Sequence, residues 1–420
     1  MITFLKNKNE FLIFFIIGFF VFALTGNYTS DYIRLVFIKL FLIFLISREV
    51  SLISEVKKKF RKKNLITVLI ILFFISITIS FIFSPLDINQ SSIETSGVRY
   101  MHSITNILLF VSLYFYFYVK NINYKYLFNF ILFSGLLIFI SISIIYIFKI
   151  GQITEGRMQI FFGNTRQVGL FLTFIICFLI GCLVHDLKNH KNKIIITLPF
   201  FLSLVILLGN RASLISVFAT LILFFLINII LKQKVLKIFL IFFLSLGVGI
   251  LIKDLLIFAS IIISGNKFIF NESFDITRLN LLSIYDRIEQ WKYGVKIFLE
   301  NLYFGLGSNG FAISALNEKY QTGYPIFAYY SHPHNLFIQF LVEWGLVGTL
   351  LLLLLLGGLF YSSIKCLVFE KKKIILIPGL GIIALSIHGL VDGSYYHPIT
   401  SFYLVLSFSL LSAEIIKKNK

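Results

Sequence analysis

The clearest candidates for proton chemistry are two histidines in one short run, Ser331-His332-Pro333-His334-Asn335. Histidine is the side chain that most often transfers protons near neutral pH. The two-residue spacing does not suit a pair of metal ligands on one helix face, and no Cys or Glu completes a zinc set. We therefore expect His332 and His334 to be acid–base groups and not ligands of a metal.

Three arginines stand at positions that suggest an anion site. Arg211 lies in the short hairpin 209–213, Arg287 opens an amphipathic stretch, and Arg166 lies in the turn 163–167. A guanidinium group binds phosphate through two parallel hydrogen bonds. Alternatively, an arginine at a membrane boundary only extends to the lipid headgroups. At this point both interpretations stay open.

Carboxylate and amide side chains accompany these groups. Asp392 lies in a turn near the end of the chain, where it could orient a histidine or pair with an arginine. Asn335, Gln339 and Glu343 share one helix face, which puts Glu343 roughly 12 Å below Asn335. A carboxylate at that depth in a membrane is costly unless it is paired or faces water. For Glu343 we favour a structural hydrogen bond over a role in the chemistry.

The composition places these residues in a membrane protein. Of 420 residues, 58% are hydrophobic and 14% are charged, whereas soluble domains have about 45–50% and about 25%. We predict an all-α polytopic fold in a single domain, residues 1–420, with about twelve membrane-spanning helices of about 20 residues each. The apolar stretches are 11–25, 32–47, 65–83, 104–119, 126–148, 168–184, 194–208, 212–231, 238–263, 335–359, 374–391 and 399–416.

The net charge of +19 is divided unequally between the two sides of this topology. One set of alternate loops, together with both termini, holds 24 Lys and Arg, and the opposite set holds 12. Lys- and Arg-rich loops are cytoplasmic, so both termini are predicted to be cytoplasmic, and no nucleic-acid partner is needed to explain the charge. Seven of the nine Arg lie on the outer side. Topology does not require them there, and they suggest a phosphate-bearing ligand on that face.

The outer side carries one long polar segment, residues 264–334. Loops of this length are uncommon in compact proteins and tend to be functional. Within it, residues 284–302 have the apolar spacing of an amphipathic helix, and Ser283 and Asp286 have the spacing of a capping box in front of it. We expect a large periplasmic loop whose amphipathic helix lies flat on the membrane surface.

Several motifs, taken in order, resemble those of one known family. They are Asn210-Arg211-Ala212-Ser213; Arg287-x-x-x-Trp291 followed by Phe304-Gly305-Leu306-Gly307; His332-Pro333-His334-Asn335 followed by Glu343-Trp344-Gly345; and Gly389-Leu390-Val391-Asp392. In their order, spacing and sidedness they make residues 160–400 resemble the O-antigen ligase and O-antigen polymerase superfamily of bacterial inner membranes.

The resemblance implies a glycosyltransferase of lipopolysaccharide biosynthesis. Its donor would be a glycan on undecaprenyl diphosphate at the periplasmic face of the inner (cytoplasmic) membrane, and no metal or other cofactor would be required. By position, Arg211 and Arg287 would bind the diphosphate, His334 would act as general base on the acceptor hydroxyl, and Asp392 would support it. Arg166 stands where many relatives have Asn and would be a third phosphate contact specific to this chain.

Two acceptors and one other class of protein stay open. A ligase passes the glycan to a lipid A–core sugar or another acceptor, including protein, whereas a polymerase passes it to a second lipid-linked repeat unit. Twelve spans, one dominant outer loop and the last outer turn favour the ligase. A transporter of a lipid-linked anion would show inverted repeats, broken midplane helices and buried charges. The sequence contains no evident repeat and few mid-span charges, namely Lys39, Lys253, Asp254 and Glu343.

Overall fold

The structure, a computed structural model, describes residues 8–23, 28–51, 54, 65–82, 84, 93–120, 124–148, 153–154, 157–158, 165–185, 190–230, 236–264, 281–315, 332–370, 372–392 and 398–417. Within these ranges the chain is almost entirely helical. The exceptions in regular structure are two short strands, β1 (Ile153–Thr154) and β2 (Arg157–Met158), which pair antiparallel. The predicted helical architecture is therefore confirmed for the described part of the chain.

Twelve apolar helices in the described ranges coincide with the twelve predicted stretches. They are α1 (Lys8–Phe19), α2 (Tyr28–Glu49), α4 (Leu65–Ile82), α5 (Ile93–Val119), α6 (Tyr124–Phe148), α7 (Thr165–Val184), α8 (Lys191–Leu207), α9 (Arg211–Ile230), α10 (Leu236–Ser264), α13 (Leu336–Val368), α14 (Leu376–Gly389) and α15 (Pro398–Ile416), with 3-10 turns η1 (Phe20–Ala23) and η3 (Lys373–Ile375). Among the described residues, seven helices are long and apolar enough to cross a membrane: α5, α6, α7, α9, α10, α13 and α15. The chain is thus a multi-pass membrane protein, and a total of twelve crossings stays a prediction.

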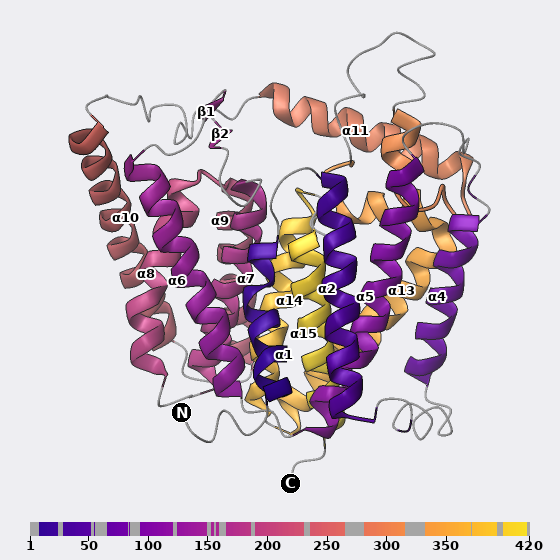
Figure 1. Ribbon diagram of the computed structural model, residues 1–420, viewed down its shortest axis with the longest axis horizontal. Helices are drawn as coiled ribbons and strands as arrows, with labels where there is room; N and C mark the ends of the chain where they lie inside the picture. Colours follow the sequence, from indigo (N-terminus) through magenta and orange to yellow (C-terminus); the bar gives the residue numbers. More distant parts are fainter. Residues whose placement is uncertain are drawn as a thin grey trace.

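The helices stand side by side, and one helix lies across an end of the bundle (Figure 1). That helix is α11 (Leu281–Glu300), and it packs against α13. The first residues of α1 and the last residues of α15 lie at the opposite end (Figure 1). The bundle therefore has two distinct ends, and α11 marks one of them.

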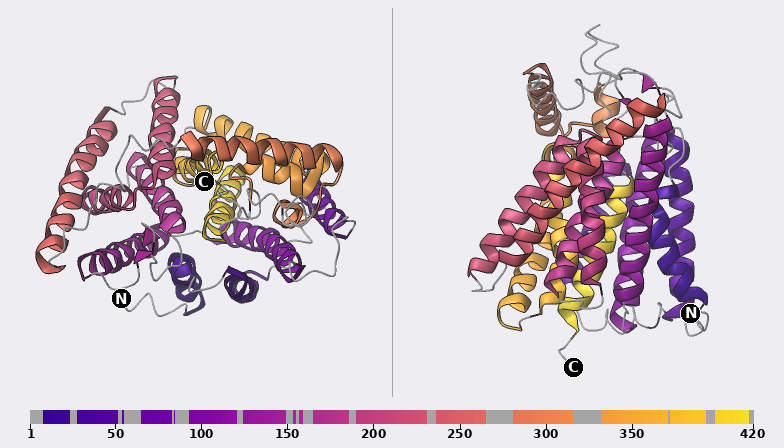
Figure 2. Two further views of the ribbon diagram at one scale, coloured as in Figure 1. Left: turned by 90° about the horizontal axis from the view of Figure 1, so that it is seen from above. Right: turned by 90° about the vertical axis from the view of Figure 1, so that its left-hand side faces the viewer.

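Burial distinguishes the centre of the bundle from its edge. In α7, 94% of the apolar window is buried, and this helix packs against α8, α9, α14 and α15. In α10, at the edge of the view from above (Figure 2), only 11% is buried. Its leucines Leu236, Leu244 and Leu255 are all more than half exposed. An outward apolar surface of this kind is stable against lipid and unfavourable in water.

The long helix α13 is broken at Gly345, where the backbone has a φ of 62° and a ψ of −167°. A broken helix frees backbone polar groups, which hydrocarbon cannot satisfy. The segment 302–307, which follows α11, supplies the missing partners. Leu306 N and Gly307 N donate to the carbonyls of residues 342 and 343, at 2.8 and 2.9 Å, and the N–H groups of residues 346 and 347 donate to the carbonyls of residues 302 and 303. The break and the segment thus stabilise each other.

The amphipathic helix of the long outer segment is confirmed, with one correction at its start. The helix α11 covers Leu281–Glu300, close to the predicted 284–302. Ser283 and Asp286 lie inside it, so the predicted capping box is wrong. Its spacing is also common within helices, because any two residues three apart share a helix face. Of the predicted loop 264–334, residues 265–280 and 316–331 lie outside the described residues.

We predict that Gly345→Ala destabilises the protein. A Cβ at this position would lie 2.4 Å from the Tyr303 carbonyl oxygen, and the positive φ disfavours any L side chain. The free energy of unfolding should fall by about 1–3 kcal/mol, as measured by thermal or denaturant unfolding in detergent micelles.

The matched control is Gly357→Ala in the same helix, where an added Cβ meets no heavy atom within 4 Å. This variant should be at least as stable as the wild type, because Ala is the better helix former. Equal stabilities for the two variants would show that the break does not depend on glycine.

Candidate functional site

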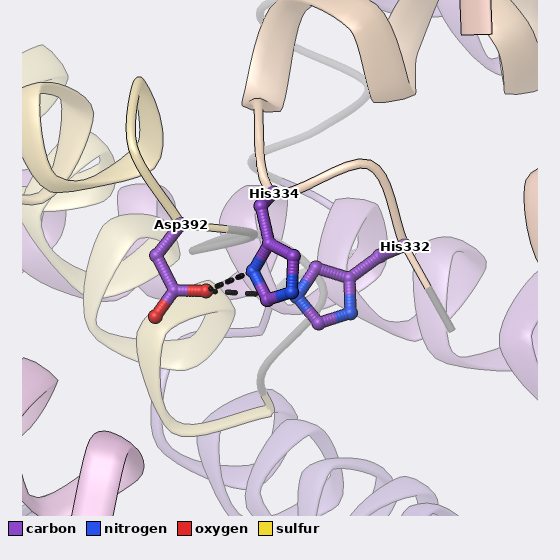
Figure 3. A group of neighbouring side chains, drawn as sticks. All are labelled: His332, His334 and Asp392. Atoms are coloured by element: carbon purple, nitrogen blue, oxygen red, sulfur yellow. Dashed lines mark hydrogen bonds and ion pairs between the residues drawn. The ribbon is translucent and has the colours of Figure 1, made fainter. Parts of the chain in front are cut away.

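Two histidines and an aspartate meet at the end of the bundle that carries α11. His334 Nδ1 lies 2.9 Å from Asp392 Oδ1, and His332 Nε2 lies 3.6 Å from the same oxygen (Figure 3). The two imidazole rings lie 4.2 Å apart between centroids. All three residues are at most 7% exposed. The structure therefore brings together residues separated by 58 positions in the chain.

The geometry assigns different states to the two nitrogens of His334. An ionised carboxylate only accepts hydrogen bonds, so a neutral His334 paired with it carries its proton on Nδ1, and its Nε2 then keeps the lone pair. A carboxylate in this position fixes the ring orientation and stabilises the imidazolium that forms when Nε2 takes a proton. The contact from His332 is too long for a hydrogen bond. His334 is therefore the better placed of the two to act as a base.

The cap of α13 joins His334 to the segment that carries Asp392. Asn335 accepts hydrogen bonds from Phe337 N and Ile338 N through its side-chain oxygen, at 3.0 and 3.2 Å, and so caps the helix. Its Nδ2 donates to Leu390 O at 3.2 Å. Asn335, predicted as a supporting residue, thus holds the start of α13 against the end of α14.

The backbone at His334 is strained. Its φ is 50°, in the left-handed region that few non-glycine residues adopt. Such strain persists only where surrounding contacts over-determine it, and it is concentrated at functional sites. Two contacts supply this support. The side chain of His334 is hydrogen-bonded to Asp392, and the next residue, Asn335, caps α13.

A hydrogen bond connects helix α11 to the segment that carries the two histidines. Trp291 Nε1 donates to the Pro333 carbonyl at 3.0 Å, between the two histidines in sequence. Arg287 stands one turn before Trp291, on the same helix face, and is half-buried. The bond thus fixes the helix that carries Arg287 beside the His–Asp group.

The hairpin with Arg211 approaches the same end from another side. Asn210 caps α9 by accepting from Ser213 N at 3.2 Å, and Arg211, the first residue of α9, is exposed. Ser213 Oγ lies 3.4 Å from His388 Nε2 at the end of α14. His388 O in turn accepts from Asp392 N at 3.0 Å. A short series of contacts therefore connects the Arg211 turn to Asp392.

Sequence reasoning did not single out His388, the connecting residue of this series. It lies four residues before Asp392, which is the spacing of one helical turn. That spacing was the available signal.

Arg166 lies in the first turn of α7, but its side chain lies outside the described part of the structure. One turn further on, Gly169 packs so closely on the hairpin that an added Cβ would lie 1.9 Å from Asn210 Nδ2. The backbone of Arg166 is therefore in a helix turn next to the Arg211 hairpin. A phosphate contact by Arg166 stays a prediction.

Glu343 is separated from the histidines and lies at the break of α13. Its carboxylate accepts from Gln339 Nε2 at 3.3 Å, and its carbonyl accepts from Ser80 Oγ at 2.5 Å and from Gly307 N at 2.9 Å. The side chain is buried. The structural role that we favoured for Glu343 stays a prediction.

Asp392 adds a third possible metal ligand to the two histidines. The ligand atoms of His332, His334 and Asp392 lie within 4.8 Å of one another. Two His and one Asp form a donor set that zinc accepts. The interpretation of the sequence considered only Cys and Glu as a third ligand and did not include Asp392. The physical reason is tertiary, because Asp392 comes from the far end of α14. His334 Nδ1 is hydrogen-bonded to Asp392 Oδ1, so a metal would have to bind through the other ring nitrogen or the other carboxylate oxygen.

The fold and the site together describe a multi-pass membrane protein with a buried His–Asp pair at one end. Among families of known proteins, the O-Antigen ligase family matches residues 196–353. The match runs from α8 to the upper part of α13 and includes Arg211, Arg287 and both histidines, but not Asp392 or Arg166. The chain thus resembles the O-antigen ligase and polymerase superfamily, as the motifs indicated. No curated protein matches the chain.

We predict that the His–Asp group functions without a bound metal. Asp392 is hydrogen-bonded to His334 Nδ1, which is the role of a carboxylate that orients an acid–base histidine. Elemental analysis of protein purified without chelator should find far less than one equivalent of zinc or another transition metal. One equivalent in the wild type that is absent from Asp392→Ala would instead establish a metal centre.

Proposed function

We propose that this protein is a membrane glycosyltransferase that transfers a glycan from undecaprenyl diphosphate to a sugar of lipid A–core, as an O-antigen ligase does. The observation that carries the proposal is the His334–Asp392 pair at one end of a multi-pass bundle. His334 lies inside the stretch 196–353 that matches the O-Antigen ligase family, and Asp392 lies beyond its end. The pair supplies a base, and the neighbouring elements supply cations. Both are needed to displace a diphosphate from a sugar.

The reaction follows from the geometry of the pair. His334 Nε2 removes the proton from the acceptor hydroxyl, and the hydroxyl oxygen forms a bond to the anomeric carbon of the donor sugar. The bond from that carbon to the diphosphate oxygen breaks, and its electron pair leaves with the diphosphate. Direct displacement inverts the anomeric configuration. Asp392 stabilises the imidazolium that results, which makes the proton transfer more favourable.

The arginines stabilise the leaving group. Negative charge grows on the diphosphate as the bond breaks, and guanidinium groups at a partly dry boundary stabilise it more than water does. Arg211 at the start of α9 and Arg287 in α11 are carried by elements with contacts to the His–Asp segments. Arg166 would be a third contact from α7.

The location of the site supports a topology with both termini in the cytoplasm. The first helix starts and the last helix ends at the end of the bundle opposite α11 (Figure 1). If the Lys-rich end is cytoplasmic, the His–Asp pair and α11 face the periplasm of a bacterial inner membrane. A donor presented there on undecaprenyl diphosphate would reach the pair without crossing the bilayer.

A polymerase, which extends a second lipid-linked glycan, is the alternative with the same chemistry. Both acceptors offer a sugar hydroxyl to the same base, so the site residues do not separate them. The single dominant outer segment and the last outer turn, which ends at Asp392, favour the ligase.

A transporter of a lipid-linked anion is the alternative from another class. The break in α13 and the buried Lys39 are features that it would show. In transporters with broken helices, however, the freed helix ends point at the substrate. Here they bond to residues 302–307, which favours a structural purpose for the break.

We predict that Arg211→Ala and Arg287→Ala each insert normally and lose glycan transfer. Removing one donor to a developing charge typically costs about 2.7–4 kcal/mol of barrier, or about 10²–10³ in kcat. The measurement is transfer from a lipid-linked glycan by protein in vesicles. Arg34→Ala, on the same predicted side but outside the proposed site, is the control and should retain activity. Full activity in both site variants would show that Arg211 and Arg287 do not bind the diphosphate.

We predict that His334→Ala lowers transfer by about 10²–10⁴-fold, the usual contribution of a general base. His332→Ala should keep part of the activity, because its contact with Asp392 is longer. Asp392→Asn should also lower the rate of transfer, since it weakens the hydrogen bond that orients His334. If His332→Ala is the more damaging change, the base has been assigned to the wrong histidine.

The acceptor is decided by a reconstitution. Purified protein receives a lipid-linked glycan together with either lipid A–core or a second lipid-linked unit. We expect elongation of lipid A–core. Elongation of the second lipid-linked unit alone would make the protein a polymerase, and export of the donor without any new glycosidic bond would favour the transporter.

A further inference from the structure

One face of α11 is buried against the rest of the protein. Its buried positions have the three- and four-residue spacing of a single helix face and are Gln290, Tyr293, Gly294 and Ile297. Tyr293 and Ile297 belong to an apolar cluster that also contains Val342 of α13. Gln290 is the polar member of this face, and it is only 1% exposed.

The side-chain amide of Gln290 has no protein partner in the described part of the chain. Neither its Oε1 nor its Nε2 is hydrogen-bonded to a described residue, and no other amide among these residues has both atoms buried and unpaired. A buried amide without partners costs free energy that an apolar side chain at the same position would not cost. A native protein that keeps such a group needs a reason for it, and contact with a ligand is one.

Two contacts locate Gln290 beside the histidines. A Cβ added to Gly294 would lie 2.5 Å from Ile338 Cγ2. Three residues earlier in α11, Trp291 Nε1 donates to the carbonyl of Pro333, which is five residues before Ile338. The two segments therefore run in the same direction. Because Gln290 is adjacent to Trp291, it lies level with the segment that carries the two histidines.

The neighbours of Gln290 on α11 change character at this level. Arg287 precedes Gln290 by three residues on the same helix face and is half-buried. The residues that follow Gln290 on this face, from Tyr293 onwards, pack in the apolar cluster. Gln290 thus stands where the face changes from apolar packing to the groups that we propose for the chemistry.

The chemistry of an amide indicates what it would bind. Its NH₂ group donates and its oxygen accepts, and a sugar hydroxyl also does both. A diphosphate only accepts, so it is better matched by guanidinium groups than by an amide whose oxygen would face it. The unpaired amide therefore suits the hydroxyl groups of a sugar and not the diphosphate.

We propose that Gln290 binds hydroxyl groups of a sugar at the reacting centre, donating to one through Nε2 and accepting from another through Oε1. The inference rests on the proposed function, since it takes the His334–Asp392 pair as the place where the sugars react. Both the acceptor sugar and the first sugar of the donor carry such hydroxyls. We expect the acceptor sugar, because Gln290 lies level with the base that removes the acceptor proton.

The first test measures stability and needs no activity. Gln290→Leu replaces the amide by an apolar side chain of similar size and breaks no bond to the protein, so its melting temperature in detergent should equal or exceed that of the wild type. The matched control is Gln339→Leu, at a glutamine that is 2% exposed and donates to Glu343. This control should melt below the wild type, because it leaves a buried carboxylate without its partner.

A melting temperature of Gln290→Leu as low as that of Gln339→Leu would overturn the inference. It would show that the protein itself satisfies the Gln290 amide and that the residue has a structural role.

The second test measures specificity. Protein in vesicles receives acceptors that each lack one hydroxyl next to the accepting one, and donors whose first sugar lacks one hydroxyl. We expect one acceptor analogue to lower kcat/KM of the wild type by about ten- to a hundredfold, as when a buried polar group loses its partner. In Gln290→Leu the same analogue and the complete acceptor should react equally fast, because the missing hydroxyl no longer has a partner.

The outcomes separate this inference from the proposed function. Loss of discrimination against a donor analogue would assign the amide to the donor sugar. An equal loss of rate with every substrate, or unchanged discrimination in Gln290→Leu, would overturn the inference. Lys292→Ala, at an exposed position of α11, is the control and should keep both the rate and the discrimination of the wild type. A wild type that transfers glycan to no acceptor would contradict the proposed function and, with it, this inference.

Discussion

The organisation of the site depends on the backbone pairing between residues 302–307 and the break of α13 at Gly345. In a bilayer, a helix can break only if the chain itself supplies partners for the freed N–H and C=O groups. Here the segment that follows α11 supplies them. The same pairing fixes the direction of the upper half of α13, which begins beside His334, and anchors the end of α11, which carries Arg287. A single set of hydrogen bonds thus sets the position of two of the elements that the proposed chemistry needs.

The His334–Asp392 pair depends in turn on how α13 starts and how α14 ends. Asn335 caps α13 and reaches the Leu390 carbonyl, and the Asp392 N–H returns to His388. These neutral bonds hold a strained His334 against a carboxylate that is almost completely buried. The arrangement is similar to part of the Ser-His-Asp triad of hydrolases, in which a buried carboxylate orients the imidazole. The proposed role of His334 in proton transfer would account for strain and burial at the same residue.

Charge has three different uses in this chain. The lysines cluster in the loops on one predicted side and serve orientation, as the distribution of positive charge in membrane proteins requires. The arginines are more frequent on the other predicted side. Arg166 and Arg211 stand in the first turns of α7 and α9, and Arg287 stands in the second turn of α11. Inside the bundle, Lys39 has a third use, because it donates to Asn106 and so connects α2 to α5.

The sequence by itself determined the helices, their order and the amphipathic α11, because long apolar runs and helical spacing are local properties. It also determined the histidine run, the arginines and the resemblance to a family, since each is carried by residues close together in the chain. Only the tertiary structure decided which residues meet. It joined His334 to Asp392, brought His388 to Ser213 and broke α13 at Gly345. Contacts between residues far apart in the chain depend on how helices pack, and the identity of a residue does not encode its distant neighbours.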